Sequence, residues 1–149
     1  MITKKVAIAI ILDLNEETIL FLKYLKRNDG LLYLPGGKIE DGERAMSALR
    51  RELSEELGLA DYRRIKFISE STDENTDPGT AYRLHAFLYA IDDSKEVRNM
   101  EPEKHELFAI GIGKLRDADI PIRPHDRGIV AAAIPEIENA LKNIKTATR

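Results

Sequence analysis

The segment from Gly37 to Leu59, GKIEDGERAMSALRRELSEELGL, constrains this chain most, because several of its glutamates share one face of a predicted helix. Residues three and four apart are neighbours on a helix surface, so the side chains of Glu52, Glu55 and Glu56 come together. An apolar stripe lies about 100° away around the helix axis and predicts the face that packs on a core. Its residues are Met46, Leu49, Leu53 and Leu57.

The acidic face is unfavourable for the helix taken alone. Like charges repel one another, and the last turns of a helix favour cations over carboxylates. Gly58 follows directly, and glycine is the residue best suited to the left-handed conformation that ends a helix. A cluster of carboxylate oxygens is what a hard divalent cation requires. The alternative is a solvated acidic face, with Arg50 and Arg51 as incidental partners.

Two neighbouring features favour the cation site. Ala45 and Ala48 lie on the same face one or two turns earlier, which predicts open space beside the acids. The turn Leu34-Pro35-Gly36-Gly37 introduces the helix, and the missing side chains allow backbone carbonyls to approach a ligand closely. We therefore interpret the acidic face as a binding site for a divalent cation.

The same segment resembles the Nudix box, G-x5-E-x7-R-E-U-x-E-E-x-G-U, where U is a bulky aliphatic residue. The box covers about one sixth of the chain, and every fixed position of it is matched. The matching residues are Gly37, Glu43, Arg51, Glu52, Leu53, Glu55, Glu56, Gly58 and Leu59. The resemblance implies an α/β fold, an α/β/α sandwich with a mixed sheet between helices. It also implies a hydrolase that acts on a nucleoside diphosphate linked to another group.

The resemblance assigns roles within the box. Glu52, Glu55 and Glu56, together with the Gly37 carbonyl, are implied ligands of Mg²⁺, for which Mn²⁺ can substitute. Such a site needs few protein ligands, because Mg²⁺ keeps several waters and also binds substrate phosphates. Arg51 is implied to orient a box glutamate with Glu43 as its partner. An ordinary intrahelical ion pair is the alternative for these two residues.

A second acidic cluster, N-M-E-P-E-K-H-E, occupies residues 99–106. It resembles a loop of eukaryotic nucleotide-triphosphate-diphosphatase members of the family. By this resemblance Glu103 is the additional metal ligand or catalytic base, with Glu106 as the second choice. Phe108 stands near the place of the tryptophan usual in that group. A solvated acidic loop is the alternative for Glu103.

Candidate substrate contacts lie outside the box. Lys23, Lys26 and Arg27 precede the glycine turn and either contact phosphates or form a solvated edge. Tyr82 and Phe108 are further candidates for contacting the substrate.

Other residues keep two interpretations. Tyr33, Tyr82 and Phe87 either stack on a base or fill the core, with the core favoured for Phe87. His85 and His105 are catalytic or, more commonly for a lone histidine near a strand, structural. Asp126 either reads a base edge or caps the last helix.

Composition limits the classes of protein that remain. The 149 residues predict a single domain over 1–149, and the net charge of −3 gives no general attraction to nucleic acid or to a membrane surface. The chain has no cysteine, which excludes thiolate catalysis and a cysteine zinc site. No signal peptide with a cleavage site is apparent, so the cytoplasm is the expected location. The family resemblance leaves a monomer or a homodimer open.

Alternating and β-branched runs predict the other elements. A helix is expected over 44–57, and a second over 124–142 that Pro135 should kink or restart. Polar or glycine-containing turns are expected at 15–17, 28–30, 72–79 and 114–117. Strands are expected over 5–14, 18–25, 31–34, 64–71, 81–91 and 106–112.

Several functions fit these residues. The favoured hypothesis is hydrolysis of a nucleoside triphosphate, including non-standard nucleotides, to a monophosphate and pyrophosphate. An ADP-ribose or nucleotide-sugar pyrophosphatase is the alternative, although Pro78 lies slightly farther from the box than the proline of that group. Dinucleoside polyphosphates are a third choice, and Tyr82 is likewise misplaced for them. A non-catalytic nucleotide-binding module would be expected to lose box acids, and none is lost here.

Overall fold

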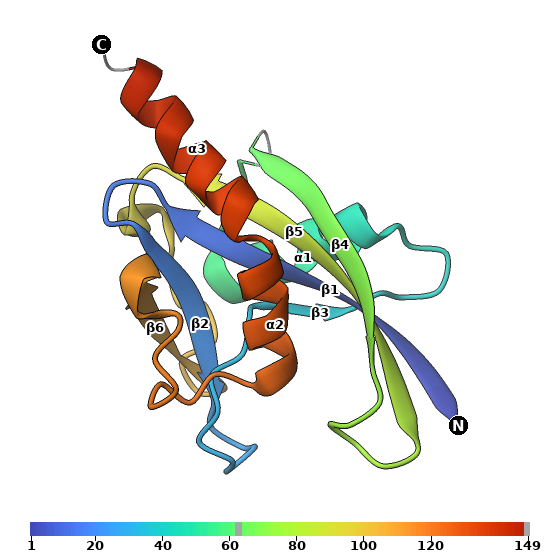
Figure 1. Cartoon of the computed structure of the whole chain (residues 1–149). Coiled ribbons are helices and arrows are strands. Elements are labelled where there is room, and N and C mark those ends of the chain that lie inside the picture. The colour runs from blue at the N-terminus through green and yellow to red at the C-terminus, as the bar shows by residue number, and fades with distance from the viewer. Residues whose placement is uncertain (62–63, 148–149) are drawn as a thin grey trace.

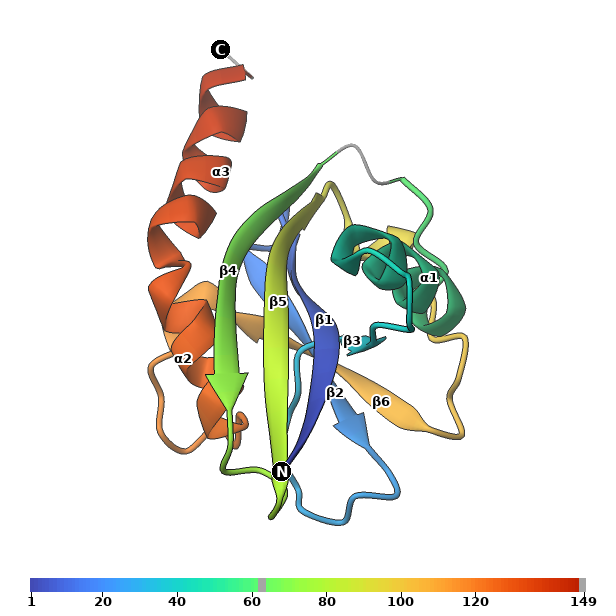
Figure 2. The same ribbon diagram turned by 90° about the vertical axis from the view of Figure 1, so that its right-hand side faces the viewer.

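The computed structural model describes residues 1–61 and 64–147, which form a mixed β-sheet with helices on both faces. Figure 2 shows the three layers, with α1 on one side of the sheet and α2 and α3 on the other. The sandwich predicted from the resemblance is confirmed. The strands are β1 (Ile2–Asp13), β2 (Thr18–Tyr24), β3 (Gly36–Lys38), β4 (Ile65–Asp73), β5 (Thr80–Ile91) and β6 (His105–Gly111). The helices are α1 (Ala45–Leu57), α2 (Pro124–Ala132) and α3 (Ile134–Ala147), with short 3₁₀ turns at Ser94–Glu96 and Ile112–Lys114.

The sheet has the strand order β4-β5-β1-β2-β6, and β3 pairs with β1 off this path. The β1–β5 pair is parallel over its full length, while the other pairs are antiparallel. β1 pairs with β2 only near their hairpin, at Leu12 and Asp13, and with β3 nearer its start, over Val6 to Ile8. The two partners of β1 therefore diverge, and the chain between them enters the resulting gap (Figure 1).

Residues 31–35 fill this gap without forming a regular strand. Leu22 and Tyr33 exchange backbone hydrogen bonds of 2.7 and 2.8 Å, and the Ala9 amide donates to the Pro35 carbonyl at 2.8 Å. The strand predicted over 31–34 is thus wrong, since only isolated bridges occur there and the regular strand is β3. Gly36 explains the shift: a Cβ there would lie 2.0 Å from the Ala7 carbonyl oxygen, so only glycine lets the chain run this close to β1.

Two cores lie on opposite faces of the sheet, as the alternation of side chains along β1 requires. Ile8, Ile10 and Leu12 face the core beneath α2 and α3. Ala7 and Ala9 face the core beneath α1, where their small size leaves room for the helix. Ala48, which we expected beside open space, is fully buried in that core, so this expectation is wrong.

The box helix α1 ends as predicted, at Gly58, whose φ of 66° is left-handed and whose amide donates to Ser54. Leu49, Leu53 and Leu57 are fully buried, which confirms the predicted core face. The acidic face lies to one side of these leucines, so the helix can bury one face and keep the other for ligands.

Pro135 restarts the last helical segment, as predicted. α2 ends at Ala132 and α3 begins at Ile134, because proline is tolerated in a first turn but not in a helix interior. α3 extends beyond the predicted end at Lys142 to Ala147. No helix in residues 1–61 and 64–147 is both long and apolar enough to cross a membrane.

Candidate functional site

Gly37 and Glu52 lie against each other at the start of the site. A Cβ built on Gly37 would lie 2.2 Å from the Glu52 carboxyl carbon, so the glycine leaves the space that this carboxylate occupies. Burial raises the pKa of Glu52, while Arg51 acts in the opposite direction. The β3 backbone and the acidic face of α1 therefore meet at this carboxylate.

Arg51 connects this carboxylate to the loop before the helix. Its Nη1 donates to Glu52 at 2.8 Å, and its Nε and Nη2 each donate to Glu43 at 3.0 Å. Nη2 also donates to the Lys38 carbonyl at 3.0 Å, and Glu55 lies 3.8 Å from Nη1. Such a forked arrangement fixes a guanidinium in one orientation. The contacts of Arg51 with a box glutamate and with Glu43 are those expected from the sequence.

Glu56 is the most deeply placed of the helix carboxylates, at 5% exposure. Burial raises its pKa to about 8, and the nearby carboxylates of Glu52 and Glu101 add to the shift. Its Oε1 is buried without a hydrogen-bond partner. Glu55, by contrast, is exposed. A buried carboxylate surrounded by like charge is unfavourable unless a cation or a proton joins it.

The loop before β6 brings a further carboxylate and an imidazole to Glu56. The Met100 amide donates to the Glu56 carbonyl at 2.9 Å, which fastens this loop to the end of α1. Asn99 then organises the turn, since its Nδ2 donates to the His105 carbonyl and its Oδ1 accepts from the Glu101 amide. As a result, ligand atoms of Glu56, Glu101 and His105 all lie within 4.8 Å of one another.

Within this loop the half-buried carboxylate is Glu101, whereas Glu103 and Glu106 are exposed. Glu103, predicted as the additional ligand or base, is not part of the cluster around Glu56, and its role stays a prediction. Sequence reasoning did not single out Glu101, although it identified the acidic loop. It left His105 open between a catalytic and a structural role, and His105 lies in the cluster while half-buried His85 does not.

The donor set fits a hard divalent cation. The carboxylates of Glu52, Glu56 and Glu101 are oxygen donors of the kind that such a cation binds. Within the described residues, one oxygen of Glu56 and both ring nitrogens of His105 are buried without hydrogen-bond partners. Burial lowers the pKa of His105, which disfavours the charged ring that would compensate the acids. Gly37 leaves room for the Glu52 carboxylate, which is near enough to Glu56 to contribute to its raised pKa. Carboxylates crowded in this way suit a hard divalent cation.

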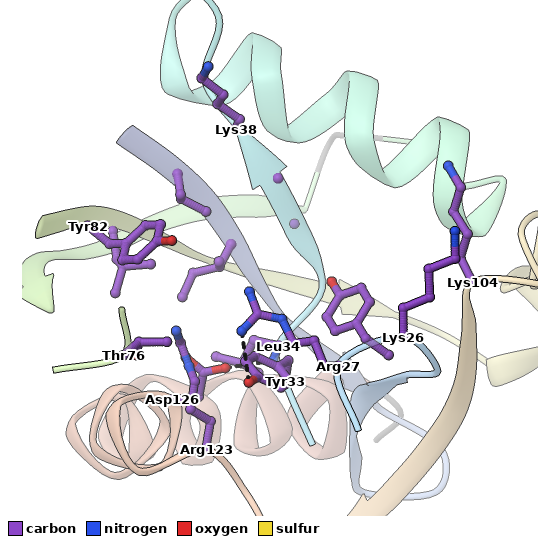
Figure 3. A pocket seen from close by; sticks show the side chains of 16 residues that line it. Lys26, Arg27, Tyr33, Leu34, Lys38, Thr76, Tyr82, Lys104, Arg123 and Asp126 are labelled. Carbon is purple, nitrogen blue, oxygen red and sulfur yellow. Dashed lines mark hydrogen bonds and ion pairs between the residues drawn. The ribbon is translucent and has the colours of Figure 1, made fainter. Parts of the chain in front are cut away.

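A pocket of about 420 Å³ adjoins this acidic region and shares Gly37 with it. Figure 3 shows the side chains that line it, which come from β1, β2, β3, β5, α2 and the intervening loops. Val6, Ile8 and Leu84 form an apolar part of the wall. Among the lining residues in the described part of the chain, the only carboxylate is Asp126, whereas the cationic residues are Lys26, Arg27, Lys38, Lys104 and Arg123.

The predicted substrate contacts divide between this pocket and other places. Arg27 and Tyr82 line the pocket, and the Tyr82 hydroxyl donates to Asp77. Lys23 is paired across the sheet with Glu106 and does not line the pocket. Phe108 packs against the core beneath α2 and α3 and is also absent from the lining. For Lys23 and Phe108, a contact with substrate stays a prediction.

Asp126 lies on the α2 side of the pocket, across from α1 (Figure 3), and is 1% exposed. It is not an N-cap, because α2 is capped by Arg123 and Asp126 lies within the first turn. Its Oδ2 accepts from the Leu34 amide at 2.9 Å, and its Oδ1 accepts from Arg123 Nε at 3.1 Å. Arg123 also lies 3.5 Å from Asp73, so buried ion pairs join α2 to the end of β4.

Comparison with known proteins gives one family. Residues 3–133 of the chain match the NUDIX domain. The structure is similar to that of a MutT NUDIX hydrolase from Burkholderia pseudomallei, with 27% identity, 89% of this chain and 98% of that chain covered, and a TM-score of 0.72. It is also similar to the E. coli ORF135 protein, with 25% identity, 91% of each chain covered and a TM-score of 0.65. A MutT protein from Methanosarcina mazei Go1 has the same fold at 19% identity, with 91% and 95% covered and a TM-score of 0.72. No functionally curated protein matches the chain.

Proposed function

The chain belongs to the NUDIX family and is a Nudix pyrophosphohydrolase, and we propose that its substrates are nucleoside triphosphates, which it converts to a monophosphate and pyrophosphate. Non-standard nucleotides are included in this proposal. Water attacks the phosphorus on one side of the α–β bridging oxygen, the bond between that phosphorus and the bridging oxygen breaks, and one proton of the water passes to a carboxylate. The reaction therefore requires binding of a polyanion, orientation of a water molecule and acceptance of a proton.

The observation that carries the proposal is the sign of charge in the pocket. Five lining residues are lysine or arginine and one is aspartate, although the protein as a whole carries a net charge of −3. Local cationic side chains beside an acidic cation site are what a polyphosphate needs in order to bind a net-negative protein. A triphosphate carries more charge and more oxygens than the diphosphate ester of ADP-ribose, so it gains more from this arrangement.

The residues that would hold Mg²⁺ or Mn²⁺ are Glu52, Glu55 and Glu56 with the Gly37 carbonyl, as the family resemblance implies, and Glu101 as a further carboxylate. A bound cation supplies Lewis-acid polarisation of the phosphate oxygens. Arg51 orients Glu52 through a 2.8 Å hydrogen bond, and its own orientation is fixed by Glu43. The chain thus holds one ligand in place before any cation arrives.

We propose that the carboxylate that accepts the proton is in the loop before β6. Glu101 is favoured by its position beside Glu56 and His105, and Glu103 is the alternative that the sequence resemblance gives. The Lys104 ammonium donates a hydrogen bond of 2.8 Å to Glu101 Oε2, which holds this side chain in place. A carboxylate next to the cation site can both orient a water molecule and take its proton.

A nucleotide panel tests the substrate class. Wild-type protein with Mg²⁺ should show a higher kcat/KM for nucleoside triphosphates than for ADP-ribose, and liquid chromatography should show monophosphate and pyrophosphate as products. Preferential conversion of ADP-ribose to AMP and ribose phosphate would overturn the substrate class while leaving the family assignment unchanged.

A further inference from the structure

Arg27 lies between two cavities and is held there by an aromatic ring. It lines both the 420 Å³ pocket and a neighbouring cavity of about 650 Å³. Its guanidinium carbon lies 4.9 Å from the centroid of the Tyr33 ring, and its Nη1 donates to the Tyr33 hydroxyl at 3.2 Å. Figure 3 shows the guanidinium beside this ring, with the hydrogen bond dashed. The arginine is exposed, yet one end of it has a fixed partner.

Tyr33 is itself fixed on several sides. Its hydroxyl donates to Asp29 Oδ2 at 2.6 Å, while Asp29 Oδ1 accepts from the Leu31 amide at 2.9 Å. The ring meets Tyr24 edge-on at 5.4 Å, and the Arg123 guanidinium lies 5.2 Å from the ring centroid. With an exposure of 6%, this tyrosine is a rigid support rather than a free stacking surface.

The remaining donors of Arg27 are available to a ligand. A guanidinium carries five N–H groups in a planar fork, and within the described part of the chain the Tyr33 hydroxyl is the one side-chain hydrogen-bond partner of Arg27. The neighbouring pocket wall carries further cations, namely Lys26, Lys38, Lys104 and Arg123. The free N–H groups therefore lie where a polyanion would bind.

We propose that Tyr33 and Asp29 are positioning residues, which hold the Arg27 guanidinium so that it contacts a phosphate of the bound nucleotide. This inference rests on the proposed function, since it assigns part of the phosphate recognition of the same pocket. An arginine side chain fixed before binding loses less conformational freedom when the substrate arrives. Its planar fork also matches two phosphate oxygens when its orientation is fixed.

A substitution of Asp29 distinguishes a positioning role from a purely electrostatic one. Its carboxylate places negative charge close to Arg27, so its neutralisation should by charge alone improve the binding of a polyanion. Positioning requires the opposite, because asparagine has one acceptor oxygen in place of two and cannot accept from both the Leu31 amide and the Tyr33 hydroxyl as Asp29 does. Weaker support of Tyr33 then releases Arg27. The two accounts therefore predict changes in KM of opposite sign.

The first experiment compares Asp29→Asn with Asp117→Asn. Asp117 is the matched control, because its Oδ1 accepts from the amide two residues later at 2.9 Å, as Asp29 Oδ1 does, but it lies away from both cavities. On the nucleotide that wild type hydrolyses fastest, Asp29→Asn should raise KM about five- to tenfold, the size expected of one lost hydrogen bond, with kcat within twofold. Asp117→Asn should match wild type. A KM for Asp29→Asn equal to or below that of wild type overturns the proposal.

The second experiment is a double-mutant cycle with Tyr33→Phe and Arg27→Ala. Tyr33→Phe keeps the buried ring and removes only the hydroxyl, and thermal melting verifies that the fold is retained. We expect it to raise KM about fivefold in wild type and to have no effect in the Arg27→Ala background, because the hydroxyl acts through Arg27. An equal effect in both backgrounds shows a structural role and overturns the proposal.

The same cycle, measured as the Kd of a non-hydrolysable nucleoside triphosphate analogue, separates this proposal from the proposed function. Coupling between Tyr33 and Arg27 in Kd without turnover of triphosphates would support the positioning role and overturn the substrate class. Turnover of triphosphates, with additive effects of the two substitutions on Kd, would support the substrate class and overturn the positioning role. Wild-type protein that neither binds nor hydrolyses any nucleotide overturns both.

Discussion

The two ends of the site are stabilised in opposite ways. At the acidic end, Glu56 is buried beside Glu52 and Glu101, and one of its carboxylate oxygens has no partner. At the other end, the buried carboxylate of Asp126 accepts hydrogen bonds from a backbone amide and from Arg123. The carboxylate at the acidic end is therefore unfavourable until a cation or a proton joins it, whereas the carboxylate at the far end of the pocket has its partners in the protein alone.

This difference indicates which region depends on a ligand and which region selects one. Groups that lack partners gain most from an added cation, so removal of one of them should affect turnover severely and stability favourably. The pocket wall has its shape without a bound cation, so removal of one cationic side chain from this wall should weaken substrate binding only mildly.

The largest effects are expected on the acidic face of α1. Glu55→Gln and Glu56→Gln should each lower kcat by more than about 100-fold, because each removes an expected ligand of the cation. Loss of a group that only orients a metal ligand typically costs about 10- to 100-fold. Far-ultraviolet circular dichroism should show an unchanged fold. Glu138→Gln, an exposed glutamate on α3, is the control. Wild-type turnover in both box variants would mean that this face is a solvated surface.

The next largest effect distinguishes two neighbouring carboxylates. If the proton acceptor lies beside Glu56, Glu101→Gln should lower kcat by about 10²- to 10⁴-fold and Glu103→Gln should have little effect. Steady-state kinetics with saturating Mg²⁺ measures both. A greater loss in Glu103→Gln would support the assignment made from the sequence and would assign Glu101 a structural role.

Stability without metal should change in the opposite direction to turnover. The pKa of Glu56 is raised from 4.5 to about 8, chiefly by burial. Between these values the folded state binds a proton that the unfolded state lacks, so Glu56 stabilises the fold at low pH and its contribution is lost as pH rises towards 8. In chelator, Glu56→Gln should therefore have a higher Tm than wild type near the upper end of this range, and the difference should shrink at lower pH.

Calorimetry over this pH range measures that difference. The lowered pKa of His105 affects the pH dependence of stability with the opposite sign, because the unfolded protein binds more protons at this ring. Both proteins contain His105, so the comparison between them still reports on Glu56. A variant that is less stable than wild type throughout would show that the Glu56 carboxylate has a favourable partner without metal.

The smallest effect is expected at the pocket wall. Lys26→Ala should raise KM for a triphosphate several-fold with kcat nearly unchanged, and the increase should diminish at high salt because screening weakens an exposed charge. Lys66→Ala, an exposed lysine on β4 outside the pocket lining, is the control. A loss confined to kcat would indicate that Lys26 acts on the reaction and not on binding.

The same two regions differ in how far the sequence predicts them. The acids of α1 are close in the chain, so helical spacing alone groups them, and the Arg51 contacts follow from the same segment. The pocket cations come from separate segments, and only tertiary structure brings Lys38, Lys104 and Arg123 together. No periodic pattern marks them in advance.

Irregular backbone limits the prediction elsewhere. Whether Glu101 or Glu103 faces α1 depends on the turn that Asn99 organises, and such a turn has no period from which to infer direction. The strand expected over 31–34 failed for a related reason, since this stretch fills the gap between two diverging strands and β3 follows it.

The central claim is that the acidic face of α1 binds a divalent cation on which hydrolysis depends. Its most direct test is a time course of triphosphate hydrolysis by purified protein, followed by liquid chromatography, with Mg²⁺, then with excess chelator, then with Mg²⁺ restored above the chelator. The account predicts that release of monophosphate and pyrophosphate stops on chelation and resumes when Mg²⁺ or Mn²⁺ is returned. Hydrolysis that continues at the full rate in excess chelator would contradict it.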